Sequence, residues 1–299
     1  MRSRFFAACL VLSGVLIACT GAPVRDAARP LKIAAWNLEH LAERDGSGCR
    51  PRTQDDYSAL RADVQRLDAD VIAFAEVESA AAAARVFPAS EYTILMSDRP
   101  DSGRDSFCRR DADSGPKINR QDVGFAIRHG IAFQRHADVD ALGLGDPDLR
   151  WGVDVTLEGA QPLRLLSLHL KSGCATGSER EACPVLFGQV PVLQGWIAAR
   201  RAEGVDFVLL GDWNRRLALP DDPVWRQLNE PDARLVDAAG GQPARCVERY
   251  PDFIDHIVLD EGAAARVVAG SFEQFDYGVP EAEHPSDHCP IALRIDGLR

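Results

Sequence analysis

Several short apolar segments of the chain end in, or soon reach, a residue type that binds metal ions or phosphate. In chain order these residues are Asn37, Glu76, His169, Asp212, Asn214, Asp255, Asp287 and His288. Phosphate diesters resist hydrolysis because the ester and the attacking hydroxide are both anionic. Catalysis therefore needs a cation at a phosphoryl oxygen and a base that takes a proton from water. A set of carboxylates, amides and histidines can supply both, so it predicts metal-assisted hydrolysis of a phosphate ester.

The expected metal ligands are Glu76, Asn37 and Asp287, and the expected cofactor is Mg²⁺ or Mn²⁺. Glu76 ends an apolar run, and its carboxylate offers the hard oxygen ligands that Mg²⁺ requires. Asn37 is predicted to act beside it, either as a neutral oxygen ligand or as a hydrogen-bond donor. Asp287 is interpreted as a ligand to the metal or to water. The alternatives are a surface acid at a strand end for Glu76 and a turn residue for Asn37.

His288 is the predicted general base, because imidazole titrates near neutral pH and can accept a proton from water. Asp212 and Asn214 are two residues apart, and on a strand they would project to the same side. We expect the acid to bind metal or orient the water, and the amide to donate to a phosphoryl oxygen. His169 is predicted to be a second donor, with a buried core histidine as the alternative. Lys171 is a candidate phosphate contact.

The apolar runs that position these residues are rich in Val, Ile, Leu and Phe, and runs of this length are typical of buried strands. They span residues 32–37, 70–76, 163–169, 206–214, 253–259 and 289–295, and further strands are expected at 123–128 and 152–157. One helix should begin at the Thr53 cap, with Asp56 three residues on, and another should run from Pro184 to Glu203 and stop at Gly204. The interleaved signals predict a sandwich of mixed sheets flanked by helices.

Together the motifs resemble the endonuclease/exonuclease/phosphatase family, the fold of pancreatic-type deoxyribonuclease, over residues 31–297. The motifs are Asn37 and Glu76 after strands, Gly211-Asp212-Trp213-Asn214, Ser286-Asp287-His288, His169 in His-Leu-Lys-Ser and Asp255 in Ile-Asp-His-Ile. The resemblance implies an α/β (α+β) fold, a four-layer sandwich of two packed mixed β-sheets flanked by helices. It also implies that Asp255 holds the second ring nitrogen of His288. No nucleophilic serine is implied, and the sequence contains no G-x-S-x-G motif.

The N-terminus predicts export. Arg2 and Arg4 precede an apolar run that ends at Ala18 and is too short to span a membrane, so residues 1–18 are interpreted as a signal peptide. Leu16-Ile17-Ala18-Cys19 resembles the lipobox of bacterial lipoproteins. We therefore expect a lipidated Cys19, a tether over residues 19–30, and a monomer that meets the membrane only through its lipid at the bacterial envelope. Ordinary cleavage near Ala22, which would give a secreted protein, is the alternative.

Six cysteines remain once Cys9 and Cys19 are set aside, and thiols of exported proteins tend to pair. Proximity predicts a Cys174–Cys183 disulfide. Cys49–Cys108 and Cys246–Cys289 are the pairs expected for the other four, although the sequence does not choose among the possible pairings. A zinc site is the rival interpretation, but no C-x-x-C pair is present.

The formal net charge of -11 argues against tight binding of duplex nucleic acid, which depends on neutralised phosphates. A basic stretch is either a local patch that steers substrate or a solvated surface loop; it contains Arg99, Arg104, Arg109, Arg110, Lys117 and Arg120. Extracellular nucleic acid, phospholipid headgroups and small phosphate esters all remain candidate substrates. The leading prediction is a phosphodiesterase or nuclease. The alternative from another class is a catalytically inactive cell-surface binding lipoprotein on the same fold.

Overall fold

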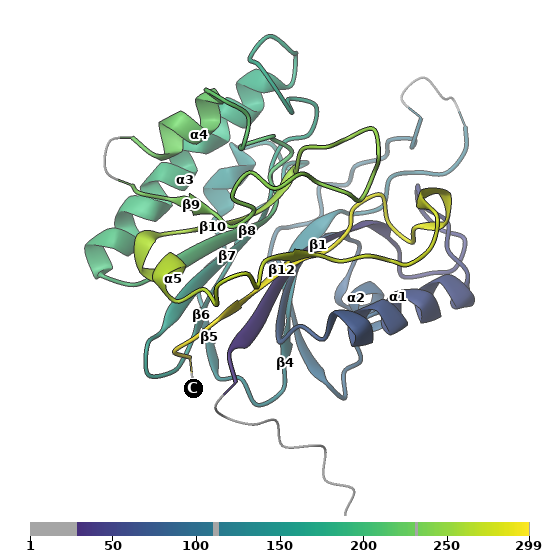
Figure 1. Cartoon of the computed structure of the whole chain (residues 1–299). Coiled ribbons are helices and arrows are strands. Elements are labelled where there is room, and N and C mark those ends of the chain that lie inside the picture. Colours follow the sequence, from purple (N-terminus) through teal and green to yellow (C-terminus); the bar gives the residue numbers. More distant parts are fainter. Residues whose placement is uncertain (1–28, 110–113, 231–232, 299) are drawn as a thin grey trace, which may run out of the picture.

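The computed structural model describes residues 29–109, 114–230 and 233–298 (Figure 1). The predicted signal peptide, Cys19 and residues 19–28 of the predicted tether lie outside these ranges. Within them, no helix is both long enough and apolar enough to cross a membrane.

Twelve strands form two six-stranded sheets in the described residues. The first sheet has the order β11-β12-β1-β2-β4-β3, with β1 Leu31–Leu41, β2 Val71–Val77, β3 Tyr92–Met96, β4 Asp122–Arg128, β11 Glu273–Gln274 and β12 Ile291–Ile295. The second has the order β5-β6-β7-β8-β10-β9, with β5 Phe133–Arg135, β6 Val153–Leu157, β7 Leu163–His169, β8 Phe207–Asp212, β9 Val236–Asp237 and β10 Asp255–Leu259. Each sheet is mixed, because β1 pairs parallel with β2 and β7 pairs parallel with β8, whereas the other pairs are antiparallel.

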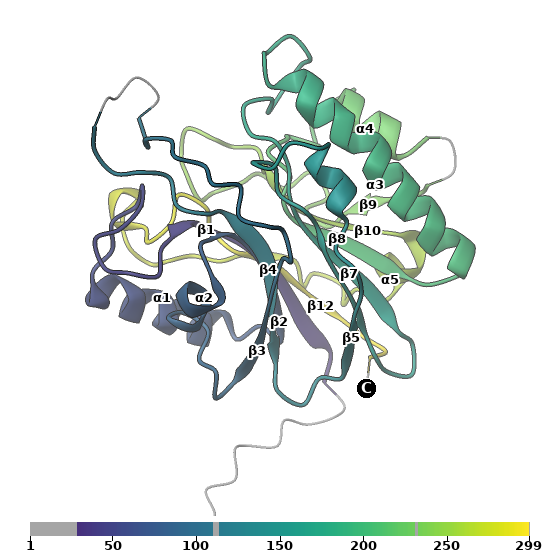
Figure 2. The same cartoon turned by 180° about the vertical axis from the view of Figure 1, so that it is seen from behind.

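The two sheets pack face to face, and the helices cover their outer faces (Figures 1 and 2). Helices α1 (Gln54–Leu67) and α2 (Ala80–Ala84) pack on the first sheet, and α3 (Cys183–Glu203) and α4 (Pro223–Leu228) pack on the second. Shorter elements are α5 (Glu261–Ala265) and the 3-10 helices Asp140–Gly143 and Glu281–Glu283. The predicted four-layer sandwich is confirmed.

Strand alternation divides the apolar residues between the layers. In β1, Ile33 and Ala35 belong to the core between the sheets, whereas Ala34 and Trp36 pack under α1 and α2. Strands β7 and β8 follow the same rule, with their inner residues at alternate positions. Any polar residue that continues the inner series at the end of a strand must therefore point into the space between the sheets.

The two predicted long helices are present with nearly the predicted bounds. Thr53 caps α1 through a reciprocal capping box with Asp56, which satisfies N–H groups that the first helical turn leaves free. Helix α3 starts one residue earlier than predicted and ends at Gly204, which has a φ of 66°. Glycine adopts this left-handed conformation without the penalty of a Cβ, so it stops the helix cleanly.

All three predicted disulfides are present: Cys174–Cys183, Cys49–Cys108 and Cys246–Cys289. The last joins residues 43 positions apart in the sequence and ties the loop before β10 to the residue that follows His288. Three disulfides are typical of proteins that fold in an oxidising compartment.

Candidate active site

Strand alternation and register bring four predicted site residues to one end of the space between the sheets. His169 ends β7, and in the sheet register it lies beside Asp212 at the end of β8, which lies opposite Asp255 at the start of β10. Asn37 comes from β1 of the other sheet, and its Nδ2 donates to Asp212 Oδ2 at 2.9 Å. This hydrogen bond joins the two sheets at the site. The expectation that the chemistry-bearing residues lie at strand ends is confirmed for His169, Asp212 and Asp255, whereas Asn37 lies inside β1, which continues to Leu41.

Glu76 reaches the same place through a break in the strand ladder. Regular β1–β2 pairing stops at Asn37 and Ala75 and resumes only at Leu41 and Val77, and Glu76 has a φ of 60°. On a regular strand its side chain would follow Phe74 toward the helices, so the bulge turns it inward. Its carboxylate accepts hydrogen bonds from Asn37 Nδ2 at 3.3 Å and from the backbone N–H of His40 at 3.0 Å. Left-handed backbone at non-glycine residues is concentrated at functional sites.

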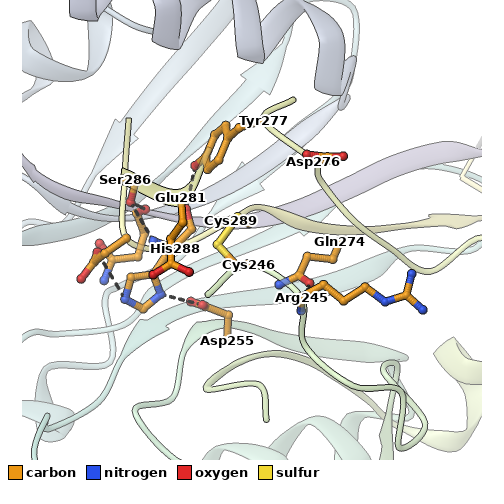
Figure 3. Close-up of a disulfide and its surroundings, with 12 residues drawn as sticks. Arg245, Cys246, Asp255, Gln274, Asp276, Tyr277, Glu281, Ser286, His288 and Cys289 are labelled. Atoms are coloured by element: carbon orange, nitrogen blue, oxygen red, sulfur yellow. Dashed lines mark hydrogen bonds and ion pairs between the residues drawn. A yellow bond between two sulfur atoms is a disulfide. The ribbon is translucent and has the colours of Figure 1, made fainter. Parts of the chain in front are cut away.

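His288 and Asp255 form a tight pair (Figure 3). His288 Nδ1 lies 2.6 Å from Asp255 Oδ2, and the two side chains are 12% and 11% exposed. Burial opposes the charge on the imidazole, but the carboxylates of Asp255 and Asp212 outweigh it and raise the pKa of His288 well above its usual range. The predicted contact between His288 and Asp255 is confirmed.

The backbone around His288 is also held in place. The Ser286 hydroxyl donates to the Asn37 carbonyl and accepts from the His288 N–H, and the Tyr277 hydroxyl donates to the His288 carbonyl at 2.6 Å (Figure 3). Trp36 Nε1 donates in turn to the Tyr277 hydroxyl. These contacts fix the loop before β12 against β1, so the imidazole of His288 has a defined position over the carboxylates.

Glu76, Asp212 and Asp255 concentrate negative charge at this end of the sandwich. Burial raises the pKa of Asp212 to about 7, and the charge of Asp255 adds to this effect. For Glu76, burial works in the same direction, but His40, the Asn37 amide and His288 outweigh it and lower its pKa. Within residues 29–109, 114–230 and 233–298, only histidines lie within ion-pair distance of these three carboxylates.

This donor set fits a divalent cation. Glu76 and Asp212 are both hydrogen-bonded to Asn37, and Asp212, Asp255 and His288 each offer a ligand atom within 4.8 Å of the others. Asp255 Oδ1 is buried and has no hydrogen-bond partner in the described part of the chain. Buried carboxylates without a lysine or arginine partner are stabilised by a bound metal, and oxygen ligands favour a hard divalent cation.

His169 and Arg150 lie behind the carboxylates. His169 Nε2 is 3.4 Å from Asp212 Oδ2, and burial together with the charge of Arg150 keeps the pKa of His169 well below its usual value. The neutral ring can therefore donate a hydrogen bond without carrying a charge. Arg150 is buried and donates to the carbonyls of His169 and Leu170, which holds the end of β7.

The structural basis proposed for Asn214 is wrong, because β8 ends at Asp212. Asn214 lies in a turn with a φ of 51°, its backbone N–H donates to Asp212 Oδ1 at 2.8 Å, and its Nδ2 donates to the Leu170 carbonyl at 3.2 Å. The turn, rather than strand alternation, keeps the amide beside the acid. A short polar side chain that bonds to the backbone favours such a turn.

Two further candidates lie at the margin of the cluster. The Asp287 carboxylate is 64% exposed and its Oδ1 is 3.8 Å from His288 Nε2. Its backbone N–H donates to Glu39 Oε2. Lys171 is partly buried two residues beyond β7, and its backbone N–H donates to the Gln189 side chain.

Sequence reasoning missed four residues that shape the site: Glu39, His40, Arg150 and Tyr277. Glu39 and His40 belong to the bulge, with φ values of 43° and 53°, and they follow Asn37 in Trp-Asn-Leu-Glu-His-Leu. A cluster of polar residues immediately after an apolar run was the available signal for these two. Arg150 and Tyr277 act on the site from distant parts of the chain, and no local pattern marks them.

Comparison with known proteins agrees with this fold. Residues 34–288 match the family model described as the Endonuclease/Exonuclease/phosphatase family. Similar solved structures include truncated TDP2 from Caenorhabditis elegans, with a TM-score of 0.58, 17% identity, and 89% of this chain and 98% of that chain covered. The human Nocturnin catalytic domain with a bound sulfate anion has a TM-score of 0.58 and 16% identity, with 91% and 96% covered.

A third similar structure is the 3′ phosphatase NExo from Neisseria bound to a product DNA hairpin. It has a TM-score of 0.57 and 17% identity, and the match covers 89% of this chain and 99% of that chain. No curated protein matches the sequence. Since the family model covers most of the chain, the protein belongs to the endonuclease/exonuclease/phosphatase family.

Proposed function

We propose that this protein is a divalent-metal-dependent phosphoesterase, of the phosphodiesterase or nuclease type, in which His288 is the general base. The observation that supports this most strongly is the 2.6 Å contact between His288 and Asp255 directly beside the buried carboxylates. A histidine held by a carboxylate next to a cation-binding cluster is suited to activating water for attack on phosphorus.

In this proposal Glu76 and Asp212 hold the Mg²⁺ or Mn²⁺ ion, with Asp287 as a further ligand from the solvent side. When bound, the cation polarises a phosphoryl oxygen and neutralises the charge that develops there. Asn37 directs its amide N–H groups at Glu76 and Asp212, while its Oδ1 accepts from the Glu39 N–H. This arrangement favours the donor role for Asn37 over the oxygen-ligand role.

His288 takes the proton from the attacking water at Nε2. Because Nδ1 is bonded to Asp255, Nε2 is the nitrogen left to face the cluster, 3.8 Å from Asp212 Oδ2. Asp255 fixes the tautomer and stabilises the imidazolium that forms after proton transfer. Asp212 is placed to orient the same water.

Neutral donors then stabilise the phosphoryl group as its charge grows. His169 presents Nε2 toward the carboxylates, and Asn214 keeps one amide N–H beyond the hydrogen bond that it makes with Leu170. Donors fixed before the reaction lose no energy in reorienting during it. Lys171 is the proposed phosphate contact at the edge of the site.

We also propose that the protein acts outside the cytoplasm, either anchored through Cys19 or secreted. The three disulfides support an oxidising compartment. Three cations of the basic stretch are engaged with acids, since Arg99 and Arg120 share Asp122 and Lys117 pairs with Asp105. Arg110 lies outside the described residues. The stretch therefore gives no support for tight duplex binding, and short or single-stranded phosphate esters are the favoured substrates.

A substrate panel tests the proposal. The purified protein is assayed on bis-p-nitrophenyl phosphate, plasmid DNA, RNA, sphingomyelin and inositol phosphates, with Mg²⁺ or Mn²⁺ and with excess chelator. We expect the protein to hydrolyse at least one diester, and we expect chelator to abolish this hydrolysis. Glu76→Gln should reduce the hydrolysis by orders of magnitude. Glu91→Gln should leave it unchanged, because Glu91 pairs with Arg128 away from the site. Cation binding without hydrolysis of any substrate would favour the inactive binding protein instead.

A further inference from the structure

A pocket of about 470 Å³ opens beside the proposed catalytic pair, and the mechanism above leaves it unused. One end is lined by Asp255, Asp287 and His288, so the pocket is continuous with the site. Its volume lies within the range of about 300–1,000 Å³ that is usual for small-molecule sites. The pocket can therefore receive the part of a substrate that adjoins the scissile phosphate, but not a nucleic acid duplex.

Three arginines from three separate loops line this pocket: Arg180, Arg216 and Arg249. Arg216 comes two residues after Asn214, Arg180 lies before α3, and Arg249 lies in the loop before β10. Four acids also line the pocket: Asp255 and Asp287 belong to the proposed catalytic site, Asp252 pairs with Arg216, and Glu281 accepts from the Glu248 N–H. Guanidinium groups bind phosphate through paired hydrogen bonds, so the arginines are the groups in this pocket that suit an anionic ligand.

Arg216 follows the turn at Asn214 and keeps hydrogen-bonding capacity for a ligand. Its Nε is buried and has no hydrogen-bond partner in the described part of the chain. Its Nη1 forms an ion pair with Asp252 at 3.6 Å, which is beyond hydrogen-bond reach. The preceding Arg215 is different, because its guanidinium bonds to Asp222 and to the carbonyls of Cys174 and Gly177. Arg215 thus holds the loop together, whereas Arg216 has donors left for a ligand.

The walls of the pocket are braced. The Cys174–Cys183 disulfide closes the loop that contains Arg180, and Cys246–Cys289 ties the loop that contains Arg249 to the residue after His288. The Tyr250 ring is 46% exposed, with the guanidinium of Arg249 4.6 Å and that of Arg216 5.9 Å from its centroid. Such stacking orients both guanidinium groups before a ligand arrives, which reduces the entropy lost on binding.

We infer that this pocket binds a second phosphate group of the substrate, one linking unit away from the scissile phosphate, with Arg216 as the residue that determines this specificity. The inference rests on the proposed function for the position of the scissile phosphate. The substrate class is then a small ester or chain end with two phosphates. A nucleotide and a polyol phosphate both provide that chemistry.

Binding titrations test the inference independently of turnover. The probes are thymidine 5′-monophosphate against thymidine 3′,5′-bisphosphate, and inositol 1-phosphate against inositol 1,4-bisphosphate, which distinguishes the two sources. In the wild type we expect the second phosphate to lower Kd about tenfold or more in one pair, since hydrogen bonds to charged groups are strong. In Arg216→Ala the Kd values for the monophosphate and the bisphosphate should become nearly equal. Arg216→Lys should restore part of the preference for the bisphosphate.

Controls separate the inference from the proposed function. Arg234→Ala removes an arginine that pairs with Glu261 on the exposed surface, and it should leave every Kd unchanged. Arg249→Ala provides a second test if Arg216→Ala proves unstable in thermal unfolding. Equal affinity for mono- and bisphosphates in both pairs would overturn the inference even if bis-p-nitrophenyl phosphate is hydrolysed. If the protein hydrolyses no substrate but binds bisphosphates more tightly than monophosphates in an Arg216-dependent way, the proposed function is overturned and the inferred second-phosphate site is supported.

Discussion

Replacing Asp255 with asparagine should lower the turnover of a phosphodiester and also move its pH dependence. The substitution exchanges a charge-assisted hydrogen bond of 2.6 Å, between side chains that are almost fully buried, for a neutral one. Such a change costs about 1–2 kcal/mol. We therefore expect kcat/KM to fall about 5- to 30-fold at a pH where His288 is unprotonated in both proteins, since about 1.4 kcal/mol is a factor of ten.

The direction of the pH shift follows from the charges around His288. A general base works when it is neutral, so activity is lost as the pH falls through its pKa. Burial lowers the pKa of His288, but the charges of Asp255 and Asp212 outweigh it and raise the value well above its usual range. Asp255→Asn removes the largest of these charge effects, so the acidic limb of the rate profile should move to lower pH.

The assay is hydrolysis of bis-p-nitrophenyl phosphate across pH at a fixed, saturating metal concentration. The matched control is Asp237→Asn, because Asp237 Oδ2 holds His256 Nδ1 at 3.0 Å in a similar pair on the opposite face of β10. In Asp237→Asn the acidic limb of the rate profile should lie at the same pH as in the wild type. A limb that stays fixed in Asp255→Asn, or moves to higher pH, would refute the role of His288 as the base.

The same pair predicts a non-additive double mutant. His288→Ala should cost about 10²- to 10⁴-fold in turnover, the usual contribution of general base catalysis. Adding Asp255→Asn should then cost little more, because residues that act as a unit do not give additive losses. If Asp255→Asn costs the same factor in both backgrounds, Asp255 acts independently of His288, for example as a metal ligand.

Two structural predictions concern the supports of the site. Replacing both Cys246 and Cys289 with serine should lower the free energy of unfolding by about 2–4 kcal/mol in a denaturant titration. Turnover should fall as well, because the disulfide braces the residue next to His288; unchanged turnover in a measurably destabilised variant would contradict that bracing. Gly211→Ala should destabilise the fold and displace the acid that follows it, because Gly211 has a φ of 141° and an added Cβ would lie 2.1 Å from the Leu168 carbonyl oxygen. A melting temperature equal to that of the wild type would contradict this prediction, because β7 and β8 could then separate to admit the Cβ without loss of stability.

Strand periodicity explains how much of the site could be predicted from the sequence. Asn37, His169 and Asp212 continue the inner apolar series of their strands, so an alternating pattern suffices to place them at one end of the sandwich. The pairing of His288 with Asp255 followed only from the resemblance to a family, since a contact between residues 33 positions apart has no local signature.

The remaining features depend on backbone that departs from regular alternation. Glu76 was predicted as a strand-end acid, but it reaches the site through a bulge that also brings in Glu39 and His40. A cluster of polar residues follows the apolar run there, but bulges have no distinctive composition, so this signal alone did not place the two residues at the site. The same limit explains Asn214, for which the sequence predicted a strand and the structure has a turn.

Metal-dependent hydrolysis in which Glu76 holds the cation is the central claim, and a metal titration of turnover tests it most directly. The protein is stripped with chelator, and hydrolysis of bis-p-nitrophenyl phosphate is followed as Mg²⁺ or Mn²⁺ is added back, with Glu76→Gln measured in parallel. We predict no turnover without metal, saturable recovery in the wild type, and recovery in Glu76→Gln only at much higher metal concentration, with both proteins equally stable to heat. Undiminished turnover in excess chelator, or identical metal titrations for the two proteins, would contradict the account.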